Sequence, residues 1–179
     1  MRGWMVFTLA LGLAMAARAA PAGRVQPVAG ADPYVAVPGA HFLADNRHDY
    51  RVLFEGRRGA DKPGELAPVV NMAGSELNTL AAHGVTRART HFVVVFHTSA
   101  SDEAVLDNAH YRARHGVDNP NLPVLAALKR EGVELYVCGQ ALMADGVPLE
   151  AVSREVTIAE DGVVVLMTYG AEGYAHLTF

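Results

Sequence analysis

The run HFVVVFH at residues 91–97 constrains the fold most strongly, because it is almost entirely β-branched or aromatic. Such a run is typical of a strand covered on both faces, as the strands of a parallel sheet are. Similar short runs predict further strands at residues 50–55, 133–138, 156–159 and 174–179. Because parallel strands need crossover connections, we expect helices between them.

The first two connecting segments carry helical patterns. Apolar residues recur at steps of three and four over residues 66–81, and Gly84 follows as a helix stop. Ser99 and Asp102 have the spacing of a capping box, which predicts a helix that starts there and ends at Gly116.

The later segments continue the alternation. Asn121 is predicted to cap a helix with Pro123 in its first turn and Gly132 after its end. VVVLM at residues 163–167 has strand propensity, but its position between two strands favours a helix. The order predicts one α/β domain over residues 50–179, with helices on both faces of an open, five-stranded, mainly parallel sheet.

The N-terminus has the layout of a secretory signal peptide. An apolar stretch runs from Met5 to Ala17 and is followed by an A-x-A pattern that ends at Ala19. This stretch is shorter than the roughly 20 residues that span a bilayer. We expect residues 1–19 to be cleaved and the mature protein to be exported, periplasmic in a Gram-negative source, without stable membrane insertion. Residues 20–49, rich in Ala, Pro and Gly, predict an extended leader.

The charge of the chain argues against two classes of partner. The formal net charge is −4, and loss of residues 1–19 would remove Arg2 and Arg18 and no acidic residue. Arg57 and Arg58 form the single basic cluster that we identify in the sequence. Nucleic acids and anionic membranes need concentrated positive charge, so we expect neither as a partner.

Cys138 is the only cysteine of the chain. An unpaired cysteine in an exported protein is either a small buried hydrophobe or a functional thiol. Cys138 ends a predicted strand, and Gly139 and Gln140 lead into a short predicted helix before Gly146. Ligands bind at the carboxyl ends of parallel strands, and a helix N-terminus favours the reactive thiolate. This placement favours a functional thiol.

The same segment resembles a known family. The pattern C-x-x-A-L-x-x-x-G-[VI] of the DsrE/DsrF-like family is matched by Cys138, Ala141, Leu142, Gly146 and Val147. HGVDNPNLPVLAALKREGVELYVCGQ at residues 115–140 and VVVFH at residues 93–97 resemble the exported branch of that family. The resemblance covers roughly residues 48–179.

The resemblance implies a three-layer α/β/α fold, trimers or hexamers, and sulfur handling without a cofactor. Cys138 would accept sulfane sulfur as a persulfide from a small sulfur compound and pass it to an acceptor thiol protein. The export signal distinguishes this chain from relatives that act in intracellular sulfur oxidation or in sulfur relay to tRNA.

His97 and Asn119 are further candidates for the site. His97 closes the strand at residues 91–97, so it would share a crevice with Cys138 if the two strands are neighbours; a structural, hydrogen-bonded histidine is the alternative. Asn119 lies in a turn and is either a turn residue or a ligand contact. None of the eight histidines pairs with another at helical ligand spacing, so no metal site is expected.

These observations leave two classes of function open. The first is a sulfur carrier or sulfurtransferase in which Cys138 is the nucleophile. The second is an oligomeric module that binds a small ligand or serves a structural role, with Cys138 packed and inert. The reactivity of the Cys138 thiol distinguishes the two.

Overall fold

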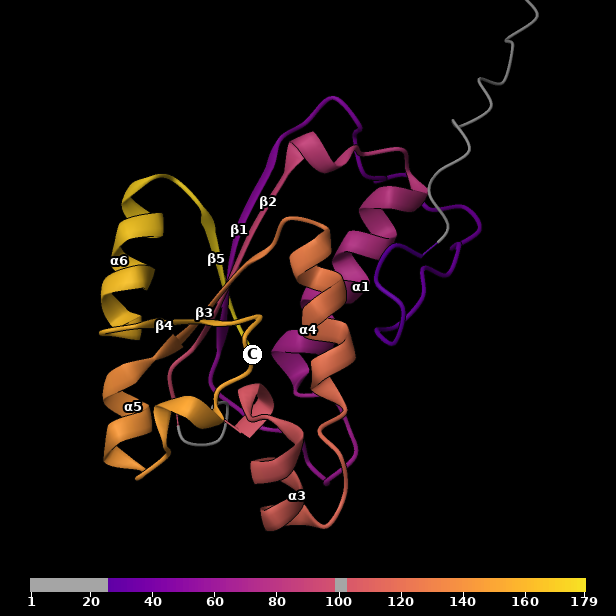
Figure 1. Cartoon of the computed structure of the whole chain (residues 1–179). Helices are drawn as coiled ribbons and strands as arrows, with labels where there is room; N and C mark the ends of the chain where they lie inside the picture. The colour runs from indigo at the N-terminus through magenta and orange to yellow at the C-terminus, as the bar shows by residue number, and fades with distance from the viewer. Residues whose placement is uncertain (1–25, 99–102) are drawn as a thin grey trace, which may run out of the picture.

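The computed structural model describes residues 26–98 and 103–179, and its strands form one sheet. All strands pair in parallel, in the order β4-β3-β2-β1-β5 (Figure 1). The predicted α/β fold with a five-stranded parallel sheet is therefore confirmed. The predicted signal peptide lies outside the described residues. The strands are β1 (Tyr50–Gly56), β2 (Thr90–Phe96), β3 (Glu134–Cys138), β4 (Thr157–Ala159) and β5 (Ala175–Thr178).

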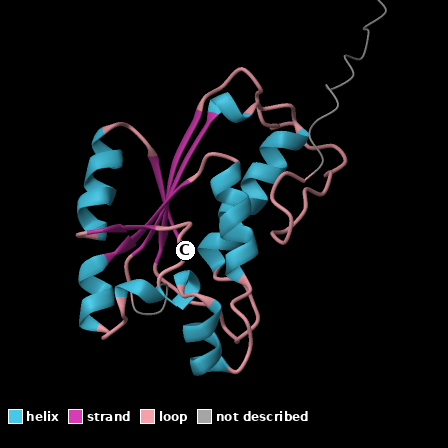
Figure 2. Cartoon of the chain, in the orientation of Figure 1, coloured by secondary structure: helices cyan, strands magenta, loops and turns pink. Residues whose placement is uncertain are grey.

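Helices cover both faces of the sheet (Figures 1 and 2). Helices α1 and α4 lie on one side, and α5 and α6 lie on the other. In the described part of the chain, no helix is both long enough and apolar enough to cross a bilayer. The helices are α1 (Pro68–Ala82), α3 (Asn108–His115), α4 (Asn121–Arg130), α5 (Gly139–Ala144) and α6 (Gly162–Ala171), with short 3₁₀ turns at η1 (Arg87–Arg89), η2 (Glu103–Val105) and η3 (Leu149–Ala151).

Alternating residues of the central strands divide the core in two, because successive side chains of a strand point to opposite faces. Phe54, Val94 and Phe96 belong to the large cluster beneath α1 and α4. Leu53 and Val93 belong to a smaller cluster that packs against Leu166 and other residues of α6. Both layers are buried, which accounts for the nearly continuous apolar run of β2.

The predicted helix from Ser99 to Gly116 is wrong in its extent. Ser99 and Asp102 lie outside the described residues, and the segment after them forms the separate elements η2 and α3. The side chain of Asp107 caps α3 by accepting a hydrogen bond from the backbone N–H of His110 at 2.8 Å. A competing N-cap within the predicted helix therefore sets its true start.

The predicted capping role of Asn121 is also wrong. Pro120 is the N-cap of α4, and Asn121 is its first residue. The backbone N–H of Asn121 donates to Oδ1 of Asn119 at 2.9 Å, while Oδ1 of Asn121 accepts from the N–H of Ala67 at 2.8 Å. Asn121 thus joins the start of α4 to the segment before α1, a partner that local sequence does not reveal.

The part of the leader that begins at Gln26 forms no helix or strand and packs on α1. Val28 is fully buried, and the buried side chain of Asn78 on α1 holds its backbone. Oδ1 of Asn78 accepts from the N–H of Val28 at 3.0 Å, and Nδ2 donates to the carbonyls of Val28 and Asp32 at 3.1 and 3.0 Å. A Cβ on Gly74 would lie 2.4 Å from Cβ of Ala31, so the absence of a side chain there permits the contact.

We expect Asn78→Ala to lower the free energy of unfolding by about 2–3 kcal/mol, because it leaves buried backbone groups of the leader without partners. Asn71→Ala is the matched control on the same helix, since the bonds of Asn71 to Asp32 are solvent-exposed. Its cost should stay below about 1 kcal/mol. Urea unfolding of both variants measures the difference, and equal costs would contradict a buried clamp.

Candidate functional site

The register of the sheet brings Cys138 and His97 together. Strands β2 and β3 are neighbours, and Phe96 is the partner of Val137 in their register. The residues that follow this pair are His97 and Cys138, so they lie side by side. Adjacent strands of a sheet are about 4.8 Å apart. Cys138 ends β3 and is the N-cap of α5, as the sequence predicts, and it is 5% exposed.

Gly162, the first residue of α6, packs against the side chains of His97 and Cys138. A Cβ built on Gly162 would lie 2.7 Å from Cβ of His97 and 3.0 Å from Cβ of Cys138. The two Cβ atoms are therefore at most about 5.7 Å apart, the sum of those distances. The positive end of the α6 dipole faces the site, and that end favours an anion such as a thiolate.

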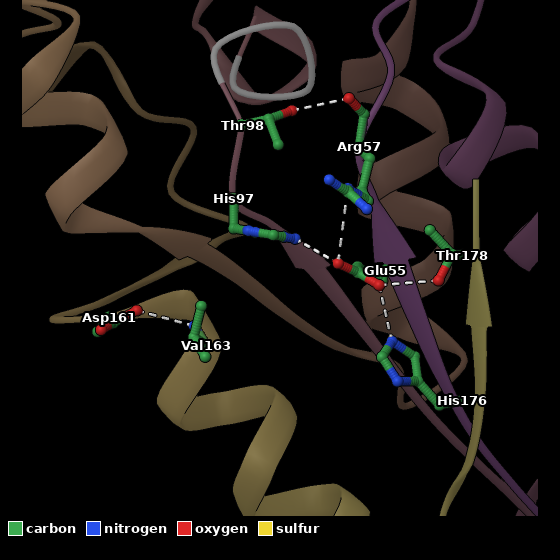
Figure 3. A network of polar contacts seen from close by, with 8 residues as sticks. All are labelled: Glu55, Arg57, His97, Thr98, Asp161, Val163, His176 and Thr178. Carbon is green, nitrogen blue, oxygen red and sulfur yellow. Dashed lines mark hydrogen bonds and ion pairs between the residues drawn. The ribbon is translucent and has the colours of Figure 1, made fainter.

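A buried carboxylate, that of Glu55, contacts His97 (Figure 3). Because β2 lies between β3 and β1, Glu55 and Cys138 flank His97 from opposite sides. Glu55 ends the apolar run of β1, and its Oε1 lies 2.6 Å from Nε2 of His97. Its Oε2 accepts a hydrogen bond from Oγ1 of Thr178 at 2.8 Å and lies 2.9 Å from Nε2 of His176. Nε of Arg57 is 3.9 Å from Oε1, with an exposed guanidinium. Three neighbouring strands thus contribute to one polar cluster at their carboxyl ends.

Glu55 is held as a carboxylate by these partners. Burial by itself raises the pKa of Glu55, but hydrogen bonds from Thr178 and His97, together with the charges of His97 and His176, outweigh burial and lower the pKa below its ordinary value. An ionised carboxylate accepts hydrogen bonds and cannot donate one. The ring nitrogens that face Glu55 are therefore the donors.

A hollow of about 360 Å³ lies near the end of β3; Ala159, the strand partner of Cys138, lines it, whereas Cys138 itself does not. Gln140 lines it, and the backbone N–H of Gln140 donates to the carbonyl of Glu160 at 3.2 Å. Gly139 allows β4 to come close, because a Cβ there would be 2.9 Å from the carbonyl oxygen of Ala159. The volume falls within the range of small-molecule sites. Its lining residues are Gln140, Ala159, Glu160, Asp161, Val164 and Val165.

Asn119 has a different position from the other predicted site residues. It is buried, and its Nδ2 donates to the carbonyls of Ala104 and Leu106 at 3.1 and 2.7 Å. Its contacts brace the segment between η2 and α4, and none of them reaches Glu55 or His97. Residues 26–98 and 103–179 contain no group of three or more His, Cys, Asp or Glu side chains placed to hold a metal ion.

Sequence reasoning missed Glu55, His176 and Thr178. One signal for Glu55 was available, since an acidic residue closes the apolar run YRVLFE. His176 and Thr178 alternate along β5 and pair in register with Leu53 and Glu55. Only the position of β5 beside β1 shows that they share the face of Glu55, and no strand order was predicted.

Gly162→Ala tests the contact between α6 and the two side chains. The added methyl must displace α6 or His97, so we expect a loss of about 1–3 kcal/mol in unfolding free energy and faster alkylation of Cys138. Gly170→Ala on the same helix is the matched control, because a Cβ there meets no atom within 4 Å. If both variants match the wild type in urea unfolding, the close approach is absent.

Glu55→Gln tests the charge of the cluster. The pKa of Glu55 is lowered on folding from its ordinary value of 4.5, so its ionised form adds stability that is fully present above pH 4.5. That contribution is lost as the pH falls through the folded-state pKa. We expect the wild type to be more stable than Glu55→Gln at pH 7, with a smaller gap at pH 3. A gap that does not change with pH in denaturant titrations would refute this assignment.

Comparison with known proteins agrees with this architecture. The family model described as DsrE/DsrF-like family matches residues 52–179. A solved structure, the protein of unknown function MTH1491 from Methanobacterium thermoautotrophicum, superposes with a TM-score of 0.52 at 19% sequence identity, covering 73% of this chain and 100% of that one. That likeness shows a shared fold. The search of curated proteins found no match. The family match spans most of the chain, from within β1 through β5, so the protein belongs to the DsrE/DsrF-like family.

Proposed function

We propose that this protein is a sulfur carrier or sulfurtransferase in which Cys138 holds sulfane sulfur as a persulfide. Membership of the DsrE/DsrF-like family suggests a role related to sulfur relay. The observation that carries the proposal is the pairing of Cys138 with His97 at the carboxyl edge of the sheet, beneath Gly162. A thiol beside an imidazole and a helix N-terminus is an arrangement that activates a cysteine nucleophile.

The proposed step transfers one sulfur atom without an added oxidant or reductant. His97 takes the thiol proton of Cys138, and the thiolate attacks the outer sulfur of a persulfide donor R–S–SH. The new S–S bond to Cys138 forms as the R–S to sulfur bond breaks, and the leaving thiolate R–S⁻ takes the proton from His97. The products are the Cys138 persulfide and the thiol R–SH. The reverse attack, by an acceptor thiolate on the outer sulfur, unloads the carrier.

The surroundings of Cys138 suit a small donor. The hollow lined by Gln140 and Ala159, residues that neighbour Cys138, is large enough for a low-molecular-weight persulfide or polysulfide. Glu160 and Asp161 line that hollow, so it should bind a dianion such as thiosulfate more weakly. Burial of the cysteine would shield a persulfide from oxidation and hydrolysis.

The proposal includes export and self-association. Residues 1–19 have the pattern of a cleaved signal peptide, and N-terminal sequencing of protein from the extracytoplasmic fraction tests this. Apolar side chains exposed on α6 favour self-association, the family resemblance suggests three or six subunits, and light scattering measures the number. These side chains are Val163, Val164 and Met167. An acceptor thiol protein completes the relay, whereas the acidic charge makes nucleic acid a poor partner.

The low exposure of Cys138 favours the alternative function, a ligand-binding or structural module with an inert thiol. The two proposals differ in what the native protein does with a thiol reagent. A carrier must admit a small electrophile to the sulfur, whereas an inert core cysteine reacts only after unfolding.

Intact-mass spectrometry of the native protein after exposure to polysulfide tests the carrier function. We expect a gain of about 32 Da, one sulfur atom, that dithiothreitol reverses. Cys138→Ala should abolish the gain, because no other cysteine exists in the chain. The variant should keep the circular dichroism spectrum of the wild type.

The matched control is His110→Gln, since His110 bonds to Asp107 on α3 and belongs to a different cluster. His110→Gln should load sulfur as the wild type does, whereas His97→Gln should load about 100-fold more slowly. Absence of the mass gain in the wild type, together with alkylation only in denaturant, would establish the inert-thiol alternative.

A further inference from the structure

His97 lies between two side chains that can take part in proton transfer, a thiol and a carboxylate. In the strand order β3-β2-β1, the side chain of His97 is flanked by Cys138 on β3 and by Glu55 on β1. All three side chains share the face covered by α6, since Glu55 pairs with Val95, two residues before His97. The imidazole therefore lies between a thiol and a carboxylate.

We propose that Glu55 is a positioning residue that fixes His97 as the Nε2–H tautomer, so that Nδ1 is the atom that exchanges a proton with the Cys138 thiol. This inference rests on the proposed function, in which His97 takes that proton. Glu55 then determines which ring nitrogen of His97 acts as the base.

The hydrogen-bond geometry supports the tautomer. Nε2 of His97 lies 2.6 Å from Oε1 of Glu55, a short distance typical of a bond to a charged acceptor. The carboxylate has no proton to give, so Nε2 must carry the hydrogen. In the part of the chain that the structure describes, Nδ1 of His97 makes no hydrogen bond, which leaves its lone pair available.

The covalent geometry of the ring points to the same assignment. Nδ1 is bonded to Cγ and so stays near the backbone of β2, whereas Nε2 is at the far end of the ring, which reaches toward β1 (Figure 3). Cβ of Cys138 is at most about 5.7 Å from Cβ of His97, the sum of their distances from the Gly162 position. Because Glu55 holds Nε2 from the side of β1, Nδ1 is the ring nitrogen left to face the thiol on the side of β3.

The burial of Glu55 makes this control effective. Its side chain is 10% exposed and that of His97 is 15% exposed, so water competes little for their bond. The carboxylate keeps its charge when His97 takes the thiol proton, and it then stabilises the imidazolium. Removing the negative charge should therefore slow thiolate formation even where the ring stays in place.

A second carboxylate–histidine pair provides the matched control. Oε2 of Glu103 lies 2.9 Å from Nε2 of His115, and the side chain of Glu103 is 38% exposed. Glu103→Gln therefore makes the same replacement in a pair that belongs to a different cluster. A general effect of replacing a carboxylate by an amide should appear in both variants alike.

The experiment uses the full chain with ¹⁵N-labelled histidine. Long-range ¹H–¹⁵N spectra of the wild type at alkaline pH should show Nε2 of His97 protonated and Nδ1 without a proton. Glu55→Gln should populate the Nδ1–H form, and it should lower the rate of Cys138 alkylation by iodoacetamide at pH 7 by about 10- to 100-fold. Glu103→Gln should keep the wild-type tautomer of His97 and change the rate less than about threefold.

A double variant separates positioning from a general loss of structure. Because Glu55 is proposed to act through His97, Glu55→Gln with His97→Gln should react no more slowly than His97→Gln alone. Independent, multiplying effects would overturn the proposal. So would a wild-type His97 in the Nδ1–H tautomer, a result that needs no folded variant.

The carrier function and the positioning role of Glu55 can be refuted independently. If the wild type gains no sulfur but shows the Nε2–H tautomer and Glu55-dependent alkylation, the carrier function is wrong and the positioning role stands. If sulfur is gained while the tautomer or the double variant disagrees, the positioning role is wrong and the carrier function stands.

Discussion

All five strands run in the same direction, and this constraint decides where the chemistry of the protein can lie. A parallel sheet places every carboxyl end at one edge, so residues that close separate strands meet there. Glu55, His97, Cys138 and Thr178 come from positions spread over most of the chain, yet each stands at the end of a strand. The connecting helices pack mainly on the faces of the sheet, so polar side chains can gather at this edge.

The two faces of the sheet use buried polar groups differently. On the side of α1 and α4, the buried amides of Asn78, Asn119 and Asn121 bond chiefly to backbone groups. Those bonds fix irregular segments, including the leader, against the core. On the side of α6, Glu55 bonds the side chains of His97, His176 and Thr178, two of which can gain or lose a proton. The first pattern holds structure in place, whereas the second can respond to chemistry.

Helix α6 links the fold to the site. Its inner face packs on Leu53, Val93 and Val95, and its first residue rests on His97 and Cys138. Any side chain at Gly162 would compete with the two groups that the proposed transfer needs. The same helix exposes Val163, Val164 and Met167, and Val164 also lines the hollow near the end of β3, so a partner or second subunit that covers this surface would lie close to that hollow.

The sequence alone determined the α/β class, the five strands and the place of Cys138, because buried runs, glycine stops and a strand end before a helix are local signals. The apolar run of β2 and the terminal position of Cys138 in β3 follow from residues close in the chain. Local signals misled where a nearer competitor existed: Asp107 caps α3, and Asn119, which precedes α4, accepts the hydrogen bond from the backbone N–H of Asn121. Only the tertiary structure decided that β5 lies beside β1 and that Gly162 covers Cys138. Strand order and side-chain networks depend on contacts between distant segments, and no single stretch of sequence encodes them.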